Sequence, residues 1–570
     1  MPNAFDAPVR GDDYHGQGSA GYCAAMPGGG KFKAGGPKPT SQLMADLWAG
    51  RFAAEGGATE GETRETGGGP ARGSSLVLPD SAATLVGAMK HPLTRVARLV
   101  PIFLLSVVGA IAQTTKPALF ALIDEHKKAY EDIALQIWNL AEIGYKEVKS
   151  SALLQRQLQG EGFAVQAGIA GIPTAFVATF GSGSPVIGIL AEYDALPGVS
   201  QEATPEKKAR PGSEAGHACG HHLFGTGSIQ AAIAVKEWMK ATGQKGTLRV
   251  YGTPAEEGGS GKVYMVRAGL FNDVDTVLHW HPSNLNGITT SGSLANKSGK
   301  FRFYGVASHA SASPERGRSA LDGVESMNYM VNMMREHVPE TTRLHYVITR
   351  GGEAPNVVPA FAEVYYYVRS PSRDIVTEVW EQVEKAATGA ALGTGTTVKW
   401  ELTGGVYELL INDTLGRVMH ENLRAVGGVT YSAAERAFAL KLAPTLGPKP
   451  PALEIAGLVA PYVANPPRET GGSTDVGDVS WTVPTVGLRA ATWVPGTPAH
   501  SWQAVACGGT TIGLKGMNVA VKTLAATAVD LFTRPEVIAR AKAEFAQKRG
   551  TDFKYAAMLG DRTPALNYRD

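Results

Sequence analysis

The sequence has few cysteines and almost no net charge. Cys23, Cys219 and Cys507 are the only cysteines among 570 residues, which is too few for a disulfide framework. A functional cysteine would therefore act as a thiolate ligand or a nucleophile. Lys and Arg total 54 and Asp and Glu total 52, so the net charge is +2. Proteins that bind nucleic acid normally carry a clear excess of basic residues, and this charge argues against such a partner.

Long hydrophobic runs are also scarce. The apolar run Leu99–Ala112 is too short for a transmembrane helix. Basic residues precede it, and it ends in the small residues Ala110 and Ala112, which is the layout of a secretory signal peptide over residues 89–112. A buried core helix is the alternative interpretation.

The segment before this run, residues 1–88, is rich in glycine and has no sustained apolar period. Such a segment buries too little surface to offset its chain entropy, so we expect it to be disordered. Alternatively it is an incorrectly assigned extension, with translation starting at Met89 and the mature chain at Gln113. The predicted location is then periplasmic or secreted, with no membrane association after cleavage. It would be cytoplasmic if the signal-like segment is not used.

From about Pro117 onward the hydrophobic pattern is that of an α/β protein. Leu119–Leu140 and His222–Thr242 have apolar residues at helical spacing, whereas Val186–Leu190 and Thr247–Thr253 are short, continuously apolar strands. Helices that alternate with such strands are typical of a largely parallel sheet covered by helices.

Between about Lys300 and Leu402 the predicted order changes to β-α-β-β-α-β. This order indicates an inserted α+β module of the ferredoxin type. We therefore predict a main domain in two parts, an insertion, and a charged helix with a tail at the end. The predicted segments are 113–298 and 405–535 for the main domain, 299–404 for the insertion, and 536–570 for the helix and tail.

Two clusters could hold a metal ion. In GHACGHH, Cys219 and His221 lie on a glycine-flanked turn before a helix, where both can face one ion. In TPAEEGG, Glu256 and Glu257 directly follow a strand, where adjacent carboxylates repel each other unless a cation neutralises them. One Glu could bind the metal while the other acts as a general base. A structural Cys and a solvated Glu pair are the alternatives.

Further polar residues follow other strands or lie in late loops. His281 in HWHP and His500 in PAHSW add two imidazoles, and the five donors together suit two divalent cations. Asp194 in AEYDALPG follows Val186–Leu190 and could orient a ligand histidine, or it could be an ordinary turn residue.

The insertion carries three more candidates, each of which could equally be an ordinary loop or surface residue. His309 lies in the loop SHASASP, and Asn356 in APNVVP precedes Arg369. An Asn and an Arg can hold a substrate carboxylate. Other motifs fail: GGSGKV at 258–263 lacks the spacing of a phosphate loop, and no Gly-x-Ser-x-Gly elbow occurs in a strand–turn–helix context.

The ordered set AEYDALPG, GHACGHH, TPAEEGG, HWHP, SHASASP, APNVVP and GTPAHSW resembles the di-metal aminoacylase/carboxypeptidase family of zinc-type amidohydrolases, in its Cys-bearing branch. The resemblance covers about residues 117–560. It implies a zinc-exopeptidase fold with an inserted ferredoxin-like lid or dimerisation domain, and a homodimer. It also implies hydrolysis of the amide bond of an N-acyl or N-aroyl amino acid, such as p-aminobenzoyl-glutamate, or of a dipeptide.

The resemblance further implies a role for each candidate. The cofactors are two divalent metal ions, Zn or Mn, with Co also compatible. Glu256 is the general base, Asp194 orients a ligand, His309 stabilises the oxyanion, and Asn356 and Arg369 bind a carboxylate. The implied metal ligands are Cys219, His221, Glu257, His281 and His500. Two other functions stay open: an inactive, receptor-like metal-binding relative, and a thiol hydrolase that uses Cys219 with His217 as its base.

Overall fold

The computed structural model describes residues 115–464, 466 and 471–569. The chain divides into two units, Met1–Pro92 and Leu93–Asp570, of which the first contains no described residue. The predicted extension and the signal-like segment 89–112 therefore lie outside the described residues. Within the described part, no helix combines the length and the apolarity needed to span a membrane.

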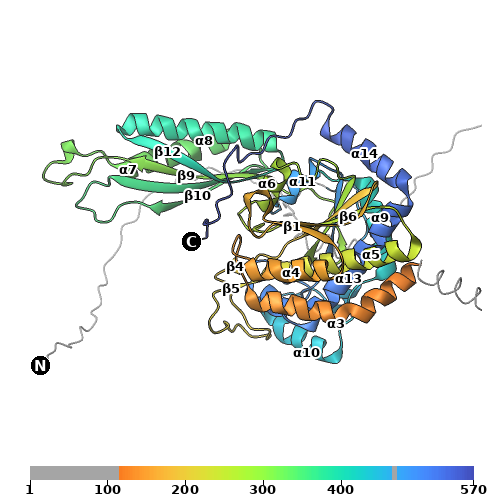
Figure 1. Cartoon of the computed structure of the whole chain (residues 1–570). Helices are drawn as coiled ribbons and strands as arrows, with labels where there is room; N and C mark the ends of the chain where they lie inside the picture. Colours follow the sequence, from red (N-terminus) through yellow and green to blue (C-terminus); the bar gives the residue numbers. More distant parts are fainter. Residues whose placement is uncertain (1–114, 465, 467–470, 570) are drawn as a thin grey trace, which may run out of the picture. The chain divides into compact units, whose positions relative to one another are not determined.

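The main domain is built on a seven-stranded sheet (Figure 1). Its central strands β6, β3, β7 and β13 are parallel, while β1, β2 and β8 add antiparallel edges. The largely parallel sheet expected from the sequence is thus confirmed. The strands are β1 (Ala164–Ala167), β2 (Phe176–Ser182), β3 (Val186–Ala191), β6 (Gly246–Gly252), β7 (Thr276–Ser283), β8 (Gly287–Ile288) and β13 (Thr485–Ala491).

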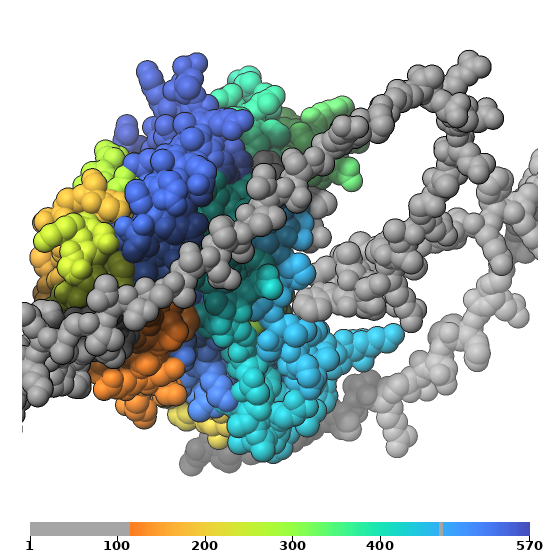
Figure 2. All heavy atoms as spheres, turned by 90° about the vertical axis from the view of Figure 1, so that its right-hand side faces the viewer, coloured from red at the N-terminus to blue at the C-terminus, as the bar shows by residue number. Residues whose placement is uncertain are grey.

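Helices pack against this sheet and against one another. Helix α5 is buried around nearly its whole circumference, and it contacts β3, β6 and β7 as well as α3 and α13. Helix α14 packs on α9, and the blue surface of α14 borders the teal surface of α9 in Figure 2. The helices are α3 (Lys116–Leu140), α4 (Val148–Gly160), α5 (His221–Thr242), α6 (Gly261–Arg267), α9 (Asp413–Val426), α10 (Ala433–Leu442), α11 (Val476–Ser480), α12 (Trp502–Gly508), α13 (Thr511–Thr533) and α14 (Pro535–Arg549).

Residues 295–406 form a small domain with the predicted β-α-β-β-α-β order. Its four strands are all antiparallel in the order β10-β11-β9-β12, and α7 and α8 pack on one face around the buried Trp380. The predicted boundaries at 299 and 404 fall inside the first and last strand. The elements are β9 (Ala295–Tyr304), α7 (Ala320–Met334), β10 (Arg343–Arg350), β11 (Phe361–Ser370), α8 (Arg373–Thr394) and β12 (Thr397–Val406).

The strand register fixes the two ends of the small domain. Ala295 of β9 pairs with Ser370 of β11 at the end where the chain enters from the main domain, and Tyr304 pairs with Phe361 at the other end. Nine residue steps of about 3.3 Å separate these ends by roughly 30 Å. Loops that follow Tyr304 or precede Phe361 therefore lie far from the junction between the domains.

Candidate metal centre

The predicted metal ligands come together at the carboxyl ends of the parallel strands. Glu192 and Asp194 follow β3, Glu256 and Glu257 follow β6, and His281 lies near the end of β7. Carboxyl ends of parallel strands share one edge of the sheet, which is where open α/β sheets place their sites. The start of α5 and the loop before α12 contribute the remaining donors.

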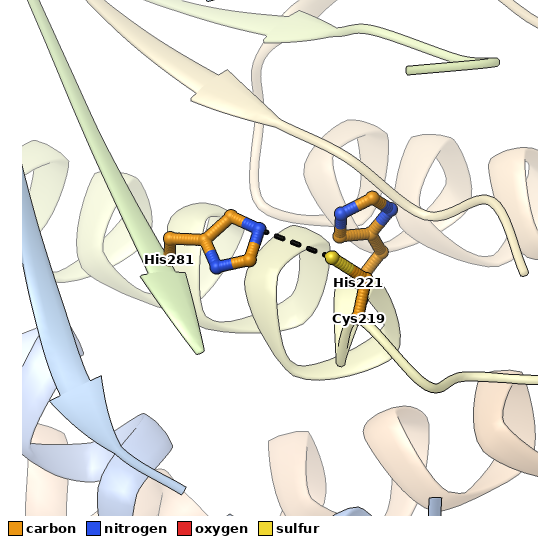
Figure 3. A group of neighbouring side chains, drawn as sticks. All are labelled: Cys219, His221 and His281. Atoms are coloured by element: carbon orange, nitrogen blue, oxygen red, sulfur yellow. Dashed lines mark hydrogen bonds between the residues drawn. The ribbon is translucent and has the colours of Figure 1, made fainter. Parts of the chain in front are cut away.

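Cys219 is the point at which two groups of donors meet. The ligand atoms of Cys219, His221 and His281 lie within 4.8 Å of one another, and so do those of Cys219, Glu257 and His500. Figure 3 shows the His281 ring directed at the Cys219 sulfur, with an Nε2–Sγ distance of 3.4 Å. All five predicted ligands are therefore brought together, with one sulfur common to both groups.

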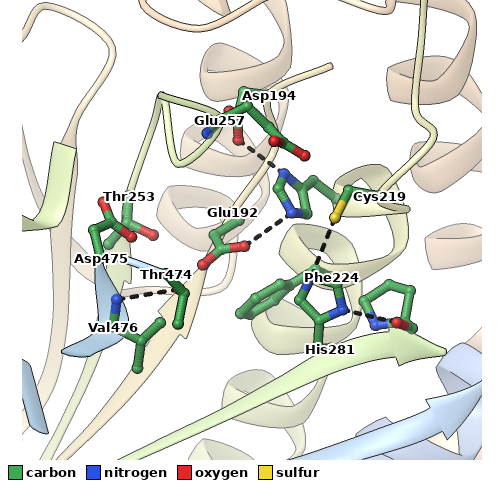
Figure 4. A network of polar contacts seen from close by, with 12 residues as sticks. Glu192, Asp194, Cys219, Phe224, Thr253, Glu257, His281, Thr474, Asp475 and Val476 are labelled. Carbon is green, nitrogen blue, oxygen red and sulfur yellow. Dashed lines mark hydrogen bonds and ion pairs between the residues drawn. The ribbon is translucent and has the colours of Figure 1, made fainter. Parts of the chain in front are cut away.

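Hydrogen bonds orient the histidine rings for ligation. His221 Nδ1 lies 2.9 Å from Asp194 Oδ1, and His281 Nδ1 lies 2.7 Å from the Pro282 carbonyl (Figure 4). Each contact favours a proton on Nδ1, which leaves Nε2 free to bind a metal. Burial lowers the pKa of His281 to about 3, so this imidazole is neutral at physiological pH. Asp194 thus lies where the sequence predicted an orienting carboxylate.

Several donor atoms at the centre form no hydrogen bond within the described part of the chain and lie instead against other candidate ligand atoms. His221 Nε2, Glu257 Oε1 and Glu192 Oε2 are buried and make no hydrogen bond to any residue that the structure describes. His500 Nε2 approaches Glu257 Oε1 to 3.2 Å, and Glu192 Oε2 approaches His221 Nε2 to the similar distance of 3.1 Å. Buried polar atoms are normally paired, so these residues fit a site that holds cations between them.

The raised pKa values of the buried acids also indicate that the centre holds cations. Burial raises the pKa of the Cys219 thiol well above its usual range, and the negative charge of Glu257 raises it further. Burial also raises the pKa of Glu256, and the negative charges of Glu192 and Glu257 raise it further. Ionised acids in such a place require a compensating positive charge, which bound cations would provide.

Lys262 and Asp475 complete the charge network, and the sequence did not predict a role for either. The fully buried Lys262 Nζ lies 2.7 Å from Glu192 Oε1 and 2.8 Å from Asp475 Oδ1. The Lys262 main-chain N–H also donates to Asp475 Oδ2, at 2.9 Å. The lysine of the rejected phosphate-loop motif is therefore an internal counter-charge. Because both carboxylate partners of Lys262 are distant in sequence, no local sequence pattern predicts this role.

Three predicted residues of the small domain are not with the metal ligands. His309 and Val357 form a bridge between the loops that follow Tyr304 and precede Phe361, and the Asn356 carbonyl accepts a hydrogen bond from Ala310. These loops lie at the end remote from the junction. Arg369 pairs with Asn296 at the junction end, and its guanidinium Nε is buried with no hydrogen-bond partner among the described residues. Within one chain, Asn356 and Arg369 cannot grip the same small carboxylate.

The alternative in which His217 activates Cys219 has no geometric support. His217 Nε2 lies 3.1 Å from the Ile137 carbonyl, and the His217 ring packs against His222 with centroids 4.9 Å apart. Burial lowers the pKa of His217 to about 3, which makes it a poor proton acceptor.

Fold and site together define a metal-dependent hydrolase. Residues 188–505 match the profile of Peptidase family M20/M25/M40. The chain is 42% identical over 469 residues to a subunit of the p-aminobenzoyl-glutamate hydrolase of Escherichia coli (strain K12), in an alignment that covers 78% of this chain and 97% of that protein. It is 30% identical over 439 residues to Xaa-Arg dipeptidase of Mus musculus, with 74% and 90% of the two chains covered.

Two solved structures share the fold. A putative aminohydrolase from methicillin resistant Staphylococcus aureus has a TM-score of 0.56 at 17% identity, and aminobenzoyl-glutamate utilization protein from Klebsiella pneumoniae has 0.52 at 18%. Each alignment covers 73% of this chain and 99% of the other. The chain belongs to Peptidase family M20/M25/M40, and it is a metal-dependent hydrolase of amide bonds.

Proposed function

We propose that the enzyme cleaves the amide bond between an acyl or aroyl group and an amino acid, with p-aminobenzoyl-glutamate as the first candidate substrate and dipeptides next. The observation that carries the proposal is the Cys219 sulfur shared by two donor groups, with Glu256 in a third group that also contains Glu192 and the ligand candidate His221. The names of the two relatives, a component of a p-aminobenzoyl-glutamate hydrolase and a dipeptidase, supply the substrate candidates.

Two divalent cations are the proposed cofactors. Cys219, His221 and His281 would hold one ion, and Cys219, Glu257 and His500 the other. Thiolate and imidazole donors favour Zn, while the carboxylate also admits Mn or Co. When bound, such ions lower the pKa of water toward neutrality and polarise a carbonyl group.

Glu256 is the proposed general base, because it is the carboxylate next to the ligand Glu257 that neither Cys219 group uses. It would accept a proton from the attacking water and return it to the leaving nitrogen, as general acid–base catalysis requires. Asp194 keeps the His221 ring in its ligating orientation through the 2.9 Å contact. At the junction end of the small domain, Arg369 is the proposed partner of the substrate carboxylate.

We further propose that the enzyme is a homodimer in which the partner copy supplies His309 and Asn356. Strand β10 is an edge strand, and Val347 in it is 56% exposed. On the neighbouring α7, Tyr329 is 68% exposed and Met333 53%. An unpaired edge beside exposed apolar side chains is suited to pairing with a second copy. The Escherichia coli relative is named as one component of a larger enzyme, so a heteromer is the other outcome to test.

Export through the segment 89–112 is also a proposal. N-terminal sequencing of the protein purified from its native source tests it. A chain that begins at Gln113 supports export, and one that retains residues 1–88 contradicts it.

The activity is tested with purified chain stripped of metal by a chelator and then supplied with Zn, Mn or Co. We expect chelation to abolish hydrolysis of the substrate panel and metal to restore it. Glu256→Gln should lower kcat by about 10²–10⁴-fold, the usual contribution of a general base, while retaining the metal content. Glu421→Gln, on the exposed face of α9, is the matched control.

Two results would contradict the proposal. A chelator-resistant activity that iodoacetamide destroys would favour a thiol hydrolase. Metal binding without hydrolysis of any N-acyl amino acid or dipeptide would favour a receptor-like protein.

A further inference from the structure

The turn that carries Glu256 and Glu257 has an unfavourable backbone. Ala255 and Ser260 flank the pair with φ of +56° and +58°, in the left-handed region that residues other than glycine rarely adopt. Gly258 and Gly259 follow directly, and glycine imposes little steric restriction on its peptide. This turn therefore depends on its surroundings to hold one conformation.

The main domain holds this turn at three points. Glu147 Oε1 accepts a hydrogen bond from the Ala255 N–H at 2.8 Å, and Asp194 Oδ2 accepts one from the Glu257 N–H at 2.9 Å. The Tyr145 hydroxyl donates to the Gly259 carbonyl at 2.7 Å. None of these contacts reaches the carbonyl of Glu257, which directly precedes Gly258.

That carbonyl is held by residues more than 300 positions further along the chain. The Tyr568 hydroxyl donates to the Glu257 oxygen at 2.9 Å, and Arg569 Nη2 donates to the same oxygen at 2.5 Å. A carbonyl has two lone pairs, and these two donors can occupy both. The Tyr568 ring also packs edge-on against Tyr145, with centroids 5.6 Å apart. A Cβ added at Gly144 would lie 2.2 Å from the Tyr568 hydroxyl oxygen, so only glycine leaves room for it.

The tail that delivers these residues, residues 551–569, is anchored along its length. Met558 is part of the core of the small domain, while the next residue, Leu559, is part of the core of the main domain. The Tyr555 hydroxyl donates to Asp478 at 2.6 Å, and the Tyr264 hydroxyl of α6 donates to the Thr563 carbonyl at 3.4 Å. The tail thus arrives at Glu257 as an ordered segment fixed to both domains.

We propose that Tyr568 and Arg569 are positioning residues of the active site. By fixing the Glu257 carbonyl they prevent the peptide between Glu257 and Gly258 from rotating, and so keep Glu256 and Glu257 in their working orientations. The inference rests on the proposed function. It adds to the active site two residues of the tail, residues 551–569, which follows the last helix of the main domain in sequence.

The test compares Tyr568→Phe, Arg569→Gln and the double variant with wild type at saturating metal. Tyr568→Phe keeps the ring packing and removes one donor, and Arg569→Lys keeps a donor at the other position. We expect kcat about tenfold lower for each single loss, the factor that corresponds to one hydrogen bond of about 1.4 kcal/mol, with KM within twofold of wild type. Asn567→Ala, an exposed neighbour, is the control and should behave as wild type.

A second readout does not require activity. Hydrogen–deuterium exchange of the peptide 254–260 should accelerate in the double variant and stay unchanged in Asn567→Ala. Wild-type kcat together with wild-type exchange in the double variant would overturn the inference. A rise in KM with unchanged kcat would also overturn it. If the double variant is unfolded, Tyr568→Phe decides by the same criteria. An inactive wild type would contradict the proposed function, while the exchange measurement would still judge the positioning role.

Discussion

At the residue scale, the buried charges around the centre form a network in which each charge is compensated by a neighbour of opposite sign. Lys262 lies between Glu192 and Asp475 at 2.7 and 2.8 Å, and none of the three side chains is more than about 1% exposed. Lys262→Met would leave two buried carboxylates without their counter-charge. We expect the free energy of unfolding to fall by about 3–5 kcal/mol, measured by urea denaturation.

The triple variant Glu192→Gln, Lys262→Met, Asp475→Asn is the matched control, because it removes all three charges and should recover much of the lost stability. Arg436→Met, at an exposed ion pair with Glu454, should change stability by less than about 1 kcal/mol. An unchanged Lys262→Met stability would show that the carboxylates are neutralised by other means.

The sequence was informative about single residues where a local pattern carried the chemistry. Cys219 lies on a glycine-flanked turn, Glu256 follows β6, and His281 lies near the end of β7. The parallel sheet brings such positions to one edge. Asp475 and Tyr568 have no such pattern, because their partners Lys262 and Glu257 lie 213 and 311 positions away. Contacts of that kind follow from the tertiary fold and cannot be predicted from one sequence.

At the scale of elements, the spacing of apolar residues along the sequence predicts most helices and strands. The antiparallel pairing of β1, β2 and β8 could not be predicted in the same way, because the spacing of apolar residues does not reveal strand direction. Helix α10 was also not predicted, although Ser432 and Glu435 form a capping box at its start. That motif is visible in the sequence as Ser-x-x-Glu and could have located the helix.

The short helix α11 carries Asp478, a buried carboxylate that accepts a hydrogen bond from the tail residue Tyr555. Burial raises the pKa of Asp478 to about 7 from an ordinary 3.8, despite hydrogen bonds from Tyr407 N–H and the Tyr555 hydroxyl. Between these two values the folded state binds a proton that the unfolded state has released. Stability contributed by Asp478 is therefore full below pH 3.8 and is lost as the pH rises through 7.

Asp478→Asn should remove this dependence while its amide oxygen still accepts a hydrogen bond. From pH 5 to pH 7.5 we expect the wild type to lose roughly 2.5 kcal/mol more unfolding free energy than the variant, from urea denaturation at both values. Parallel stability curves for the two proteins would show that Asp478 titrates normally in the folded state.

At the scale of the whole molecule, one chain does not place all predicted site residues together. His309 and Asn356 lie at the far end of the small domain, roughly 30 Å along β9 from the junction. The five proposed metal ligands and Glu256 belong to the main domain of the same chain. A second subunit that contributes the remote loops would bring the two groups together, which is the reason for proposing a homodimer with shared sites.

Mixed dimers test this arrangement directly. Glu256→Gln and His309→Ala homodimers should both be inactive, because each destroys every site. In a mixed dimer, one site receives a wild-type Glu256 from one chain and a wild-type His309 from the other. Random mixing should therefore restore roughly a quarter of wild-type activity. Glu256→Gln mixed with Asp194→Asn is the control, since both residues belong to the main domain and no intact site can form. Absence of recovery in the first mixture, with mixed dimers confirmed by differential tags, would place His309 outside the partner's site.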